Sequence, residues 1–266
     1  MSTTRLAEEV RRLQGRRRRR DELPEDRVSF ARLVGLESDE WQREVLLSEH
    51  PRLLLNCSRQ SGKSTVAAVV ALYKALRDRG ALILVLAPSE RQAKETFAKL
   101  TGFYRRLGHP VPPESYRKMG LELMNGSRVE ALPGTEKTVR GFSAVDLLVL
   151  DEAARVDDAL YHGIRPMLAV SGGRLIMMST PWGKRGVFHR EWVEGVGWER
   201  YEIPASECPR IPATFLEEER RALGRWLYQQ EYECIFGENT DAVFRHDDIK
   251  AAVTDEFCPL FTGGAP

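Results

Sequence analysis

The sequence has few cysteines, no long apolar run and almost no net charge, and each shortage excludes a class of protein. The four cysteines stand far apart and form no CxxC pair. Neither a disulfide framework nor a zinc site is therefore expected, and a reducing compartment is favoured. No apolar run approaches the roughly 20 residues that span a bilayer, and the arginine-rich start lacks the apolar stretch of a secretory signal. We therefore expect no membrane partner.

The net charge of +1 conceals an uneven distribution. Residues 1–20 contain eight arginines and two glutamates, a net of +6, so the rest of the chain carries −5. A mildly acidic folded part must bind nucleic acid through local patches rather than through a basic surface. The run Arg16–Arg20 is either a contact for nucleic-acid phosphates or a solvated tail, and the charges alone do not separate these two interpretations.

Short apolar segments alternate with longer amphipathic segments through the middle of the chain. The apolar segments have the length and composition of buried parallel strands, at residues 52–56, 81–88, 146–152 and 174–180. Helices are expected at 63–79 and from about 90 to 107, a hairpin with an Asn125-Gly126 type I′ turn at 121–132, and a last strand at 198–203. The alternation predicts an α/β fold with a mainly parallel sheet covered by helices on both faces.

The first predicted strand runs into the sequence CSRQSGKST, residues 57–65. A strand, a glycine-containing loop and a helix in this order form a phosphate-binding loop, or P-loop, in which backbone N–H groups and the helix dipole hold phosphates. We expect Lys63 to bridge the β- and γ-phosphates of ATP and Ser64 to bind Mg²⁺. The residues expected to bind the nucleotide are Ser58, Arg59, Gln60, Ser61, Gly62, Lys63, Ser64 and Thr65.

The loop departs from the GxxxxGK[ST] pattern at Cys57, which replaces the first glycine. A chance GKS tripeptide is the alternative interpretation, and the flanking strand and the acidic strand downstream argue against it. Arg59 is unusual inside such a loop. Its guanidinium can either reach the γ-phosphate or hold the loop by a salt bridge, and the first role is favoured.

Two carboxylates, Asp151 and Glu152, close the apolar strand at 146–152. Open α/β sheets bind ligands at the carboxyl ends of their strands. We expect Asp151 to hold the Mg²⁺ and Glu152 to orient and polarise the attacking water, which indicates hydrolysis rather than transfer. An isolated acidic pair would more simply be a solvated helix start, but here it follows a P-loop in the same chain.

Ser179 and Thr180 close the next apolar strand, where their hydroxyls would lie beside the γ-phosphate and sense its loss. The alternative is an ordinary strand end followed by a proline. These motifs divide the chain into a basic, flexible segment (1–27), a P-loop ATPase core (28–204), a small C-terminal helical lid (205–253) and a tail or start of a linker (254–266).

Taken together, the motifs SRQSGKS, LLVLDEA and MMSTP resemble the ATPase domain of viral large terminases, the motors that push genomic DNA into empty capsids. Trp41-Gln42 stands where that family places an adenine-reading glutamine, and the stretch from Gln229 to Phe244 resembles its run from lid into linker. The resemblance covers about residues 28–253. It implies a P-loop NTPase fold of the RecA-like (ASCE) type with a lid.

The resemblance also implies how such a chain works. Arg140 matches an arginine finger that reaches a neighbour's nucleotide, the alternative being a surface arginine. The partners would be double-stranded DNA, a capsid portal protein, a small terminase subunit and further copies of the chain in a ring, usually a pentamer. The place of action would be the host cytoplasm, with transient docking on the procapsid.

The family's second domain is a metal-dependent nuclease with clustered aspartates. This sequence ends at Pro266, and Asp247-Asp248 alone cannot form a two-metal site, so we expect no nuclease activity from this chain. For DNA contact, the basic residues around the hairpin are the hypothesis, and the run Arg16–Arg20 is its competitor. These hairpin residues are Arg117, Lys118 and Arg128.

Two other functions compete with a packaging motor. A superfamily 2 type helicase or translocase would need a second RecA-like domain, and the sequence after Thr180 is mostly helical with no further set of buried strands. A nucleotide-switched DNA-binding assembly protein would hydrolyse ATP once per assembly event. Continuous turnover stimulated by DNA separates a motor from such a switch.

Overall fold

A computed structural model of the chain describes residues 23–139 and 141–237. Three predictions concern residues outside these ranges. They are the arginine run Arg16–Arg20, the finger Arg140, and the end of the lid with the tail, residues 238–266.

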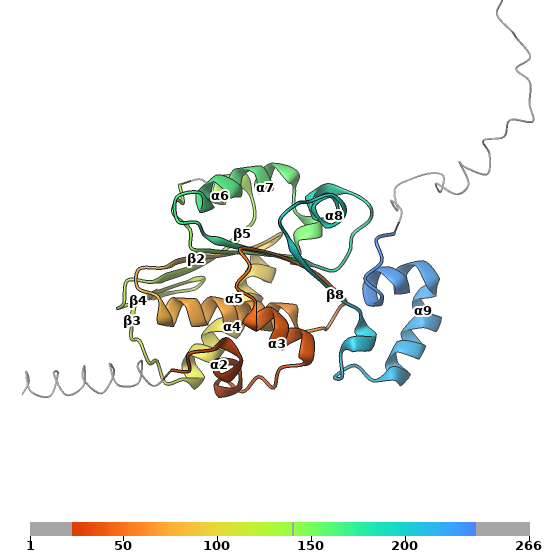
Figure 1. Cartoon of the computed structure of the whole chain (residues 1–266), viewed down its shortest axis with the longest axis horizontal. Helices are drawn as coiled ribbons and strands as arrows, with labels where there is room; N and C mark the ends of the chain where they lie inside the picture. Colours follow the sequence, from red (N-terminus) through yellow and green to blue (C-terminus); the bar gives the residue numbers. More distant parts are fainter. Residues whose placement is uncertain (1–22, 140, 238–266) are drawn as a thin grey trace, which may run out of the picture.

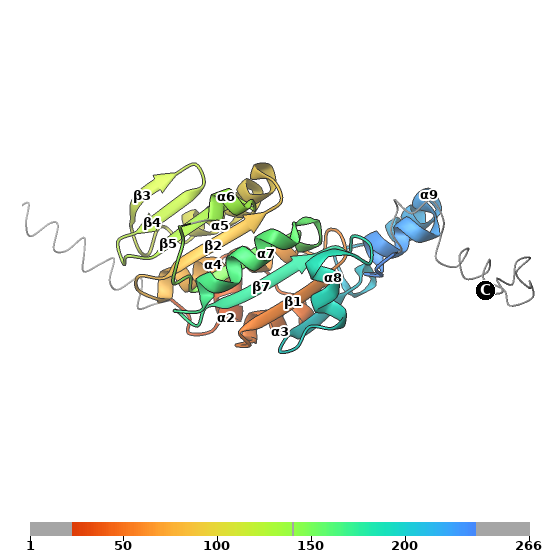
Figure 2. The same ribbon diagram turned by 90° about the horizontal axis from the view of Figure 1, so that it is seen from above.

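One eight-stranded sheet organises the described part of the chain, in the order β3-β4-β5-β2-β6-β7-β1-β8. The six strands from β5 to β8 are parallel, whereas β3 and β4 pair antiparallel at one edge (Figures 1 and 2). The strands are β1 Arg52–Cys57, β2 Leu82–Ala87, β3 Pro113–Arg117, β4 Gly120–Leu123, β5 Arg128–Pro133, β6 Leu147–Asp151, β7 Arg174–Ser179 and β8 Glu199–Ile203.

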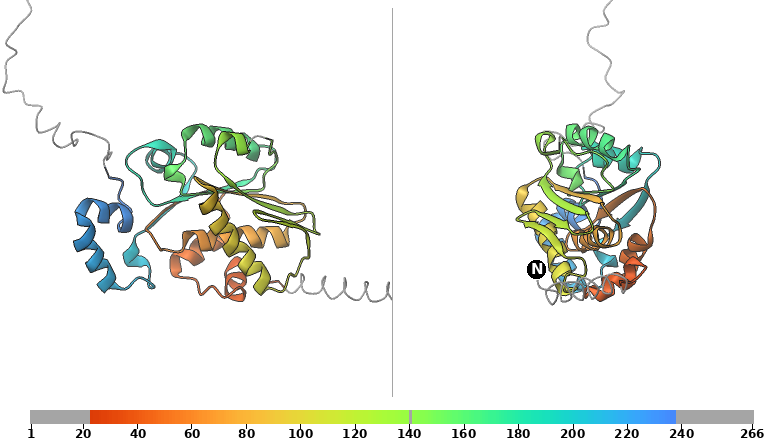
Figure 3. Two further views of the ribbon diagram at one scale, coloured as in Figure 1. Left: turned by 180° about the vertical axis from the view of Figure 1, so that it is seen from behind. Right: turned by 90° about the vertical axis from the view of Figure 1, so that its left-hand side faces the viewer.

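Helices cover both faces of this sheet (Figures 1 and 3). One face is covered by α2 (Arg27–Leu33), α3 (Glu40–Leu47), α4 (Lys63–Arg77) and α5 (Glu90–Arg106). The other is covered by α6 (Glu136–Val139), α7 (Asp158–Ile164) and α8 (Gly186–Val193), with the 3-10 turns η1 (Ala153–Arg155) and η2 (Arg165–Leu168). Beyond the β8 edge lie the turn η3 (Ala205–Glu207) and α9 (Ala213–Tyr232). In the described part of the chain, no helix is both long and apolar enough to cross a membrane.

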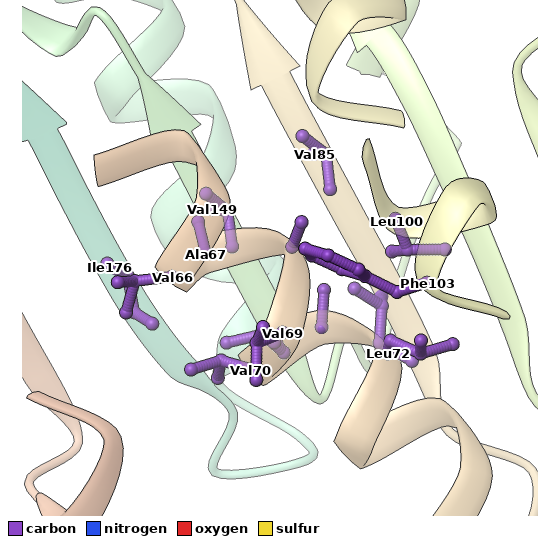
Figure 4. Packing of buried hydrophobic residues seen from close by; sticks show 14 of the residues in the cluster. Val66, Ala67, Val69, Val70, Leu72, Val85, Leu100, Phe103, Val149 and Ile176 are labelled. Carbon is purple, nitrogen blue, oxygen red and sulfur yellow. The ribbon is translucent and has the colours of Figure 1, made fainter. Parts of the chain in front are cut away.

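Two apolar clusters, one on each side of the sheet, form the core. Successive residues of a strand point to opposite faces, so Leu53 and Leu55 of β1 join the cluster under α4 and α5, and Leu54 joins the other. Each fully buried Leu or Val contributes roughly 1.5–3 kcal/mol. Figure 4 shows α4 packed into the first cluster through Val66, Ala67, Val69, Val70 and Leu72, beside Val85, Leu100, Phe103, Val149 and Ile176. The start of α4 is thereby fixed against the strand ends.

The predicted α/β fold is confirmed, with differences at the hairpin edge. Strand β3 (PESYR) was not predicted, because four of its five residues are exposed or half-buried polar side chains and the first is a proline. The type I′ turn is wrong: Gly126 has a φ of +85°, but Asn125 is not in the left-handed region. The side-chain amide of Asn125 instead donates to the carbonyls of Ala75 and Asp78, each at 2.9 Å, so contacts to the end of α4 determine the turn.

Gly173, just before the interior strand β7, gives a test of how closely the start of that strand is packed. A β-carbon there would overlap the carbonyl oxygen of Val145. Gly173→Ala should therefore lower the free energy of unfolding by about 1–3 kcal/mol, as overpacking does. Gly102→Ala is the control, because Gly102 lies inside α5 with nothing near its missing side chain, and it should raise stability by up to about 1 kcal/mol. Urea denaturation followed by circular dichroism measures the free energy of unfolding of both variants. Equal effects of the two substitutions would contradict the close packing of Gly173 against the Val145 carbonyl.

Candidate functional site

A cleft of about 700 Å³ lies at the carboxyl ends of the parallel strands. This is the edge at which open α/β sheets bind ligands. The P-loop after β1, the acidic end of β6 and the end of β7 all contribute to it, as does the face of α5 that turns toward them. The lining residues are Arg59, Gln60, Gly62, Lys63, Ser64, Thr65, Gln92, Glu95, Lys99, Glu152, Arg155, Thr180 and Arg210.

The conformation of the P-loop requires a glycine at its end. Gly62 caps α4 in the left-handed region, with a φ of +99°, where a residue with a side chain would be strained. A β-carbon there would lie 2.9 Å from Nε2 of Gln42 and 3.2 Å from Nη2 of Arg210, so both side chains approach the loop backbone closely. Inside the loop, the Ser61 hydroxyl donates to the Ser58 carbonyl at 3.0 Å. The first N–H groups of the 15-residue α4 thus face the cleft, which is the arrangement that binds phosphate.

Lys63 lies at the centre of the site and is only 8% exposed. Its Nζ is 3.1 Å from Oε1 of Glu152 and donates to Oγ1 of Thr180 at 3.2 Å. Burial by itself lowers the pKa of Lys63, but the nearby carboxylates of Glu152 and Asp151 outweigh that effect and raise the pKa above its usual value. The amine therefore stays charged, and the sequence-predicted residues Lys63, Glu152 and Thr180 are brought into direct contact.

Asp151 is 4% exposed and accepts three hydrogen bonds. Its Oδ2 accepts from the hydroxyls of Ser64 and Thr96, each at 2.9 Å, and its Oδ1 accepts from the N–H of Glu152 at 3.0 Å. Burial raises the pKa of Asp151, although the charge of Lys63 opposes the rise. Glu152 has a φ of +52°, an unusual conformation for a residue with a side chain and one that is common at active sites.

Ser64 and Asp151 fit the metal that the sequence predicts. A hydroxyl and a carboxylate within hydrogen-bond distance are hard oxygen ligands, and Mg²⁺ is usually held by one or two such groups together with substrate phosphates. In the described residues, no group of three His, Cys, Asp or Glu side chains could hold a metal ion by itself. The donors therefore suit a magnesium ion that arrives with a nucleotide.

Ser179 and Thr180 connect the P-loop to the acidic motif. The Ser179 hydroxyl accepts at 3.1 Å from the N–H of Ala154, two residues after the acidic pair, and donates to the carbonyl of Thr180 at 2.8 Å. Because Thr180 in turn accepts from Lys63, the end of β7 touches both motifs.

Arg59 is bound to the lid in this structure. The Arg59 side chain forms an ion pair with the buried carboxylate of Glu231 in α9. The backbone N–H of Arg59 also donates to the Glu231 carbonyl at 2.9 Å. The Arg59 side chain is nevertheless 59% exposed, and the residue lines the cleft. The salt bridge that the sequence allowed is therefore present here, and a γ-phosphate contact requires Arg59 to exchange partners.

Sequence reasoning missed two arginines of the cleft. Arg210, between η3 and α9, forms an ion pair with Asp39 and donates to the Ser61 carbonyl at 2.6 Å, which joins the lid segment to the P-loop. Arg155 lies over the ring of Trp182, 3.8 Å from its centroid. No local motif marks Arg210. Arg155 could have been suspected, because it follows the acidic motif by only three residues.

Of the remaining predicted residues, Gln42 reaches the P-loop, whereas the hairpin cations do not line the cleft. Gln42 is buried, accepts from the N–H of Asp39 at 3.1 Å and points its Nε2 at Gly62, so it does reach the P-loop. Arg140 lies outside the described residues. The hairpin cations lie on or beside β3 and β5, at the antiparallel side of the sheet, and each is paired: Arg117 with Glu122 and Glu130, Lys118 with Glu90, and Arg128 with Glu130, at 2.7–3.7 Å.

The sequence matches a family model and the sequences of known terminase large subunits. The family model described as the N-terminal part of the terminase large subunit of the T4-like virus type matches residues 54–251. The terminase large subunit of Escherichia phage T5 is 27% identical over 187 residues, which are 67% of this chain and 42% of the T5 protein. The chain spans about half the length of the curated relatives it matches.

Solved structures share the fold. The ATPase domain of the Thermus phage P74-26 large terminase superposes with a TM-score of 0.69 at 22% identity, covering 78% of this chain and 97% of that domain. A large terminase of a thermophilic bacteriophage, solved in complex with ADP, gives a TM-score of 0.63 at 13% identity and covers 77% of this chain and 52% of its own. The predicted RecA-like class of fold agrees with these neighbours.

The ion pair between Arg59 and Glu231 can be tested through nucleotide affinity. If the γ-phosphate must compete with Glu231 for the guanidinium, Glu231→Gln should tighten ATP binding by about two- to fivefold, since such a pair is worth up to about 1 kcal/mol. Arg59→Ala should weaken binding. Isothermal titration calorimetry measures both changes.

The control for this comparison is Glu233→Gln, which removes another lid carboxylate paired with an arginine, Arg220, at 2.9 Å. It should leave the affinity unchanged. Weaker binding by both Glu231→Gln and Arg59→Ala would mean that Arg59 serves the lid and not the phosphate.

Proposed function

The chain belongs to the terminase large subunit family, as its motifs predicted, and we propose that it is the ATP-hydrolysing motor domain that translocates viral double-stranded DNA into a capsid. The family membership supports the ATPase, and the meeting of four side chains in one cleft supports it from the structure. Lys63 and Ser64 begin α4, and Asp151 and Glu152 follow at the end of β6, with Asp151 87 residues after Ser64. The Ser64 hydroxyl contacts Asp151 at 2.9 Å, and the Lys63 amine contacts Glu152 at 3.1 Å.

In this proposal the residues divide the work of ATP hydrolysis. The N–H groups of the P-loop and the Lys63 ammonium hold the phosphates, and Ser64 and Asp151 hold the Mg²⁺, which stabilises the charge on the phosphate oxygens. In this structure Lys63 is paired with Glu152. When the γ-phosphate takes over Lys63, the Glu152 carboxylate is released to accept a proton from the attacking water.

The hydroxyls at the end of β7 are placed to report that exchange. Thr180 bonds to Lys63, and Ser179 bonds to the backbone after Glu152. Loss of the γ-phosphate returns Lys63 to Glu152. The end of β7 is hydrogen-bonded on both sides of this exchange, because Thr180 bonds to Lys63 and Ser179 bonds to Ala154 in the turn η1 after Glu152. We assign Ser179 and Thr180 the coupling of hydrolysis to movement, and Gln42 the reading of the adenine.

The wider assembly follows from the family. The proposed partners are the capsid portal protein, the small terminase subunit and neighbouring copies in a ring, usually a pentamer, which acts in the host cytoplasm while docked on the procapsid. Arg140 would complete a neighbour's site. DNA contact is assigned to Arg117, Lys118 and Arg128, whose present carboxylate partners must be exchanged for DNA phosphates on binding.

Family membership favours this motor over a superfamily 2 type helicase. The nucleotide-switched assembly protein is distinguished by turnover. A motor hydrolyses ATP continuously when DNA and the procapsid with its portal are present, whereas a switch stops after one turnover per assembly event.

The separate roles of Lys63 and Glu152 predict different defects, one in ATP binding and the other in ATP hydrolysis. Lys63→Ala should weaken ATP binding by about 100-fold or more, because a charged contact to the phosphates is lost. Glu152→Gln should bind ATP but hydrolyse it about 10²- to 10⁴-fold more slowly, because the base is lost. Calorimetry and phosphate release, with and without the procapsid, measure the two effects.

Glu95→Gln, another carboxylate of the cleft, is the control and should keep its turnover. Full turnover by Glu152→Gln would remove Glu152 from the catalytic role.

An arginine finger acting between subunits predicts complementation. Arg140→Ala subunits keep their own binding sites but leave a neighbour without its finger, whereas Glu152→Ala subunits still donate a finger. Each variant alone should be inactive, and a mixture should regain turnover because a mixed ring contains complete sites. Phosphate release across a series of mixing ratios measures the recovery. No recovery at any ratio, in samples shown to be oligomeric, would contradict the finger.

A further inference from the structure

Helix α5 forms one wall of the nucleotide cleft, and the proposed function gives this wall no task. Gln92, Glu95 and Lys99 line the cleft from successive turns of the helix. On the same side of α5, Thr96 is only 2% exposed, and its hydroxyl donates to Oδ2 of Asp151 at 2.9 Å. A residue outside every motif therefore touches the carboxylate that is expected to hold the metal.

The contact of Thr96 is unusual for a buried threonine in a helix. Such hydroxyls commonly bond to a carbonyl three or four residues earlier in their own helix. Thr101, five residues further along α5 and 4% exposed, does this by donating to the Ala98 carbonyl at 3.2 Å. Thr96 instead donates to a carboxylate that is 55 residues away in the sequence. A hydrogen bond to a charged acceptor is stronger and more directional than one between neutral groups.

The other donors to Asp151 cannot hold its side chain in place by themselves. Ser64, the second donor to Oδ2, is itself expected to turn its oxygen toward the metal. The third donor, the N–H of Glu152, belongs to the adjoining residue and reaches Oδ1. Thr96 is therefore the donor on Oδ2 that has no other task when a metal–nucleotide complex enters, and it comes from a helix anchored in the core by Ala93, Phe97 and Leu100.

We infer that Thr96 is a positioning residue for magnesium: it fixes the Asp151 carboxylate in the orientation that presents its oxygens, beside the Ser64 hydroxyl, to the Mg²⁺ of a magnesium–ATP complex. The inference rests on the proposed function, since that function supplies the metal. Partners that orient a metal ligand are worth about 10- to 100-fold in metal affinity. Thr96 would therefore act on the metal without changing the binding of the nucleotide alone.

The test measures metal-dependent nucleotide binding rather than hydrolysis. A fluorescent ATP analogue is bound to the full chain, Mg²⁺ is titrated, and fluorescence anisotropy gives the Mg²⁺ concentration at half-saturation. Thr96→Val keeps the shape and removes the donor, and it should raise that concentration about 10-fold or more. Thr96→Ser keeps the donor and should stay near wild type. Thr101→Val is the matched control on the same helix and should not shift it.

An irreversibly misfolded fraction lowers the amplitude of the anisotropy change without moving the half-saturation concentration, and binding in EDTA reports any loss of folded protein, so a less stable Thr96→Val variant still gives an answer. With EDTA in place of Mg²⁺, all four proteins should bind the analogue equally. The inference is overturned if Thr96→Val matches wild type, if Thr101→Val shifts as far, or if Thr96→Val loses affinity in EDTA. If wild type shows no Mg²⁺ dependence at all, the proposed function fails together with the inference, which distinguishes the two failures.

Discussion

The ammonium group of Lys63 is almost completely removed from water, and the chemistry of the cleft depends on what neutralises it. An unpaired buried charge is costly, and breaking a buried pair typically costs about 3–5 kcal/mol. Glu152 supplies the opposite charge in this structure, at 3.1 Å. A bound triphosphate would supply it instead. In the proposed function Lys63 would therefore have two alternative partners, and the Glu152 carboxylate would be freed to activate water only when the phosphate has arrived. Charge balance by itself would then restrain the proposed general base until ATP is in place.

The order of the strands explains why the end of β7 takes part. In the sheet, β7 lies between β6 and β1. Its last residues therefore lie between the acidic motif on one side and the P-loop on the other. Ser179 reaches the backbone of Ala154, after the end of β6, and Thr180 reaches Lys63, after the end of β1, because β7 is flanked by both strands. If β1 lay directly beside β6, the end of β7 would no longer lie between the two strands, and these hydroxyls would not flank the Lys63–Glu152 ion pair. The sensing role assigned to them is thus a consequence of topology as much as of residue type.

The parts of this site that could be predicted from the sequence are those with a local signal. Buried strands, the GKS start of α4 and a carboxylate pair at a strand end are all visible within about ten residues. The partners of Arg59 and Asp151 in α9 and α5 could not be predicted, because Glu231 and Thr96 become neighbours of the cleft only through tertiary packing. Strand β3 was missed for a related reason. Its pairing with β4 is made by the backbone, and its largely polar, exposed side chains carry no strand pattern.

Two arginines, Arg59 of the P-loop and Arg210 before α9, join the proposed lid to the P-loop. Arg210 holds the carbonyl of Ser61 and the carboxylate of Asp39, neither of which a nucleotide needs. Arg59 holds Glu231 with a guanidinium that also faces the cleft, so a phosphate can compete for it. Arg210 lines the cleft as well, so a bound triphosphate can compete for either guanidinium, whereas the backbone N–H of Arg59 keeps its bond to the Glu231 carbonyl. In the proposed function, nucleotide occupancy would thus be connected to the position of α9 through both arginines, one of which, Arg59, distinguishes this P-loop in sequence.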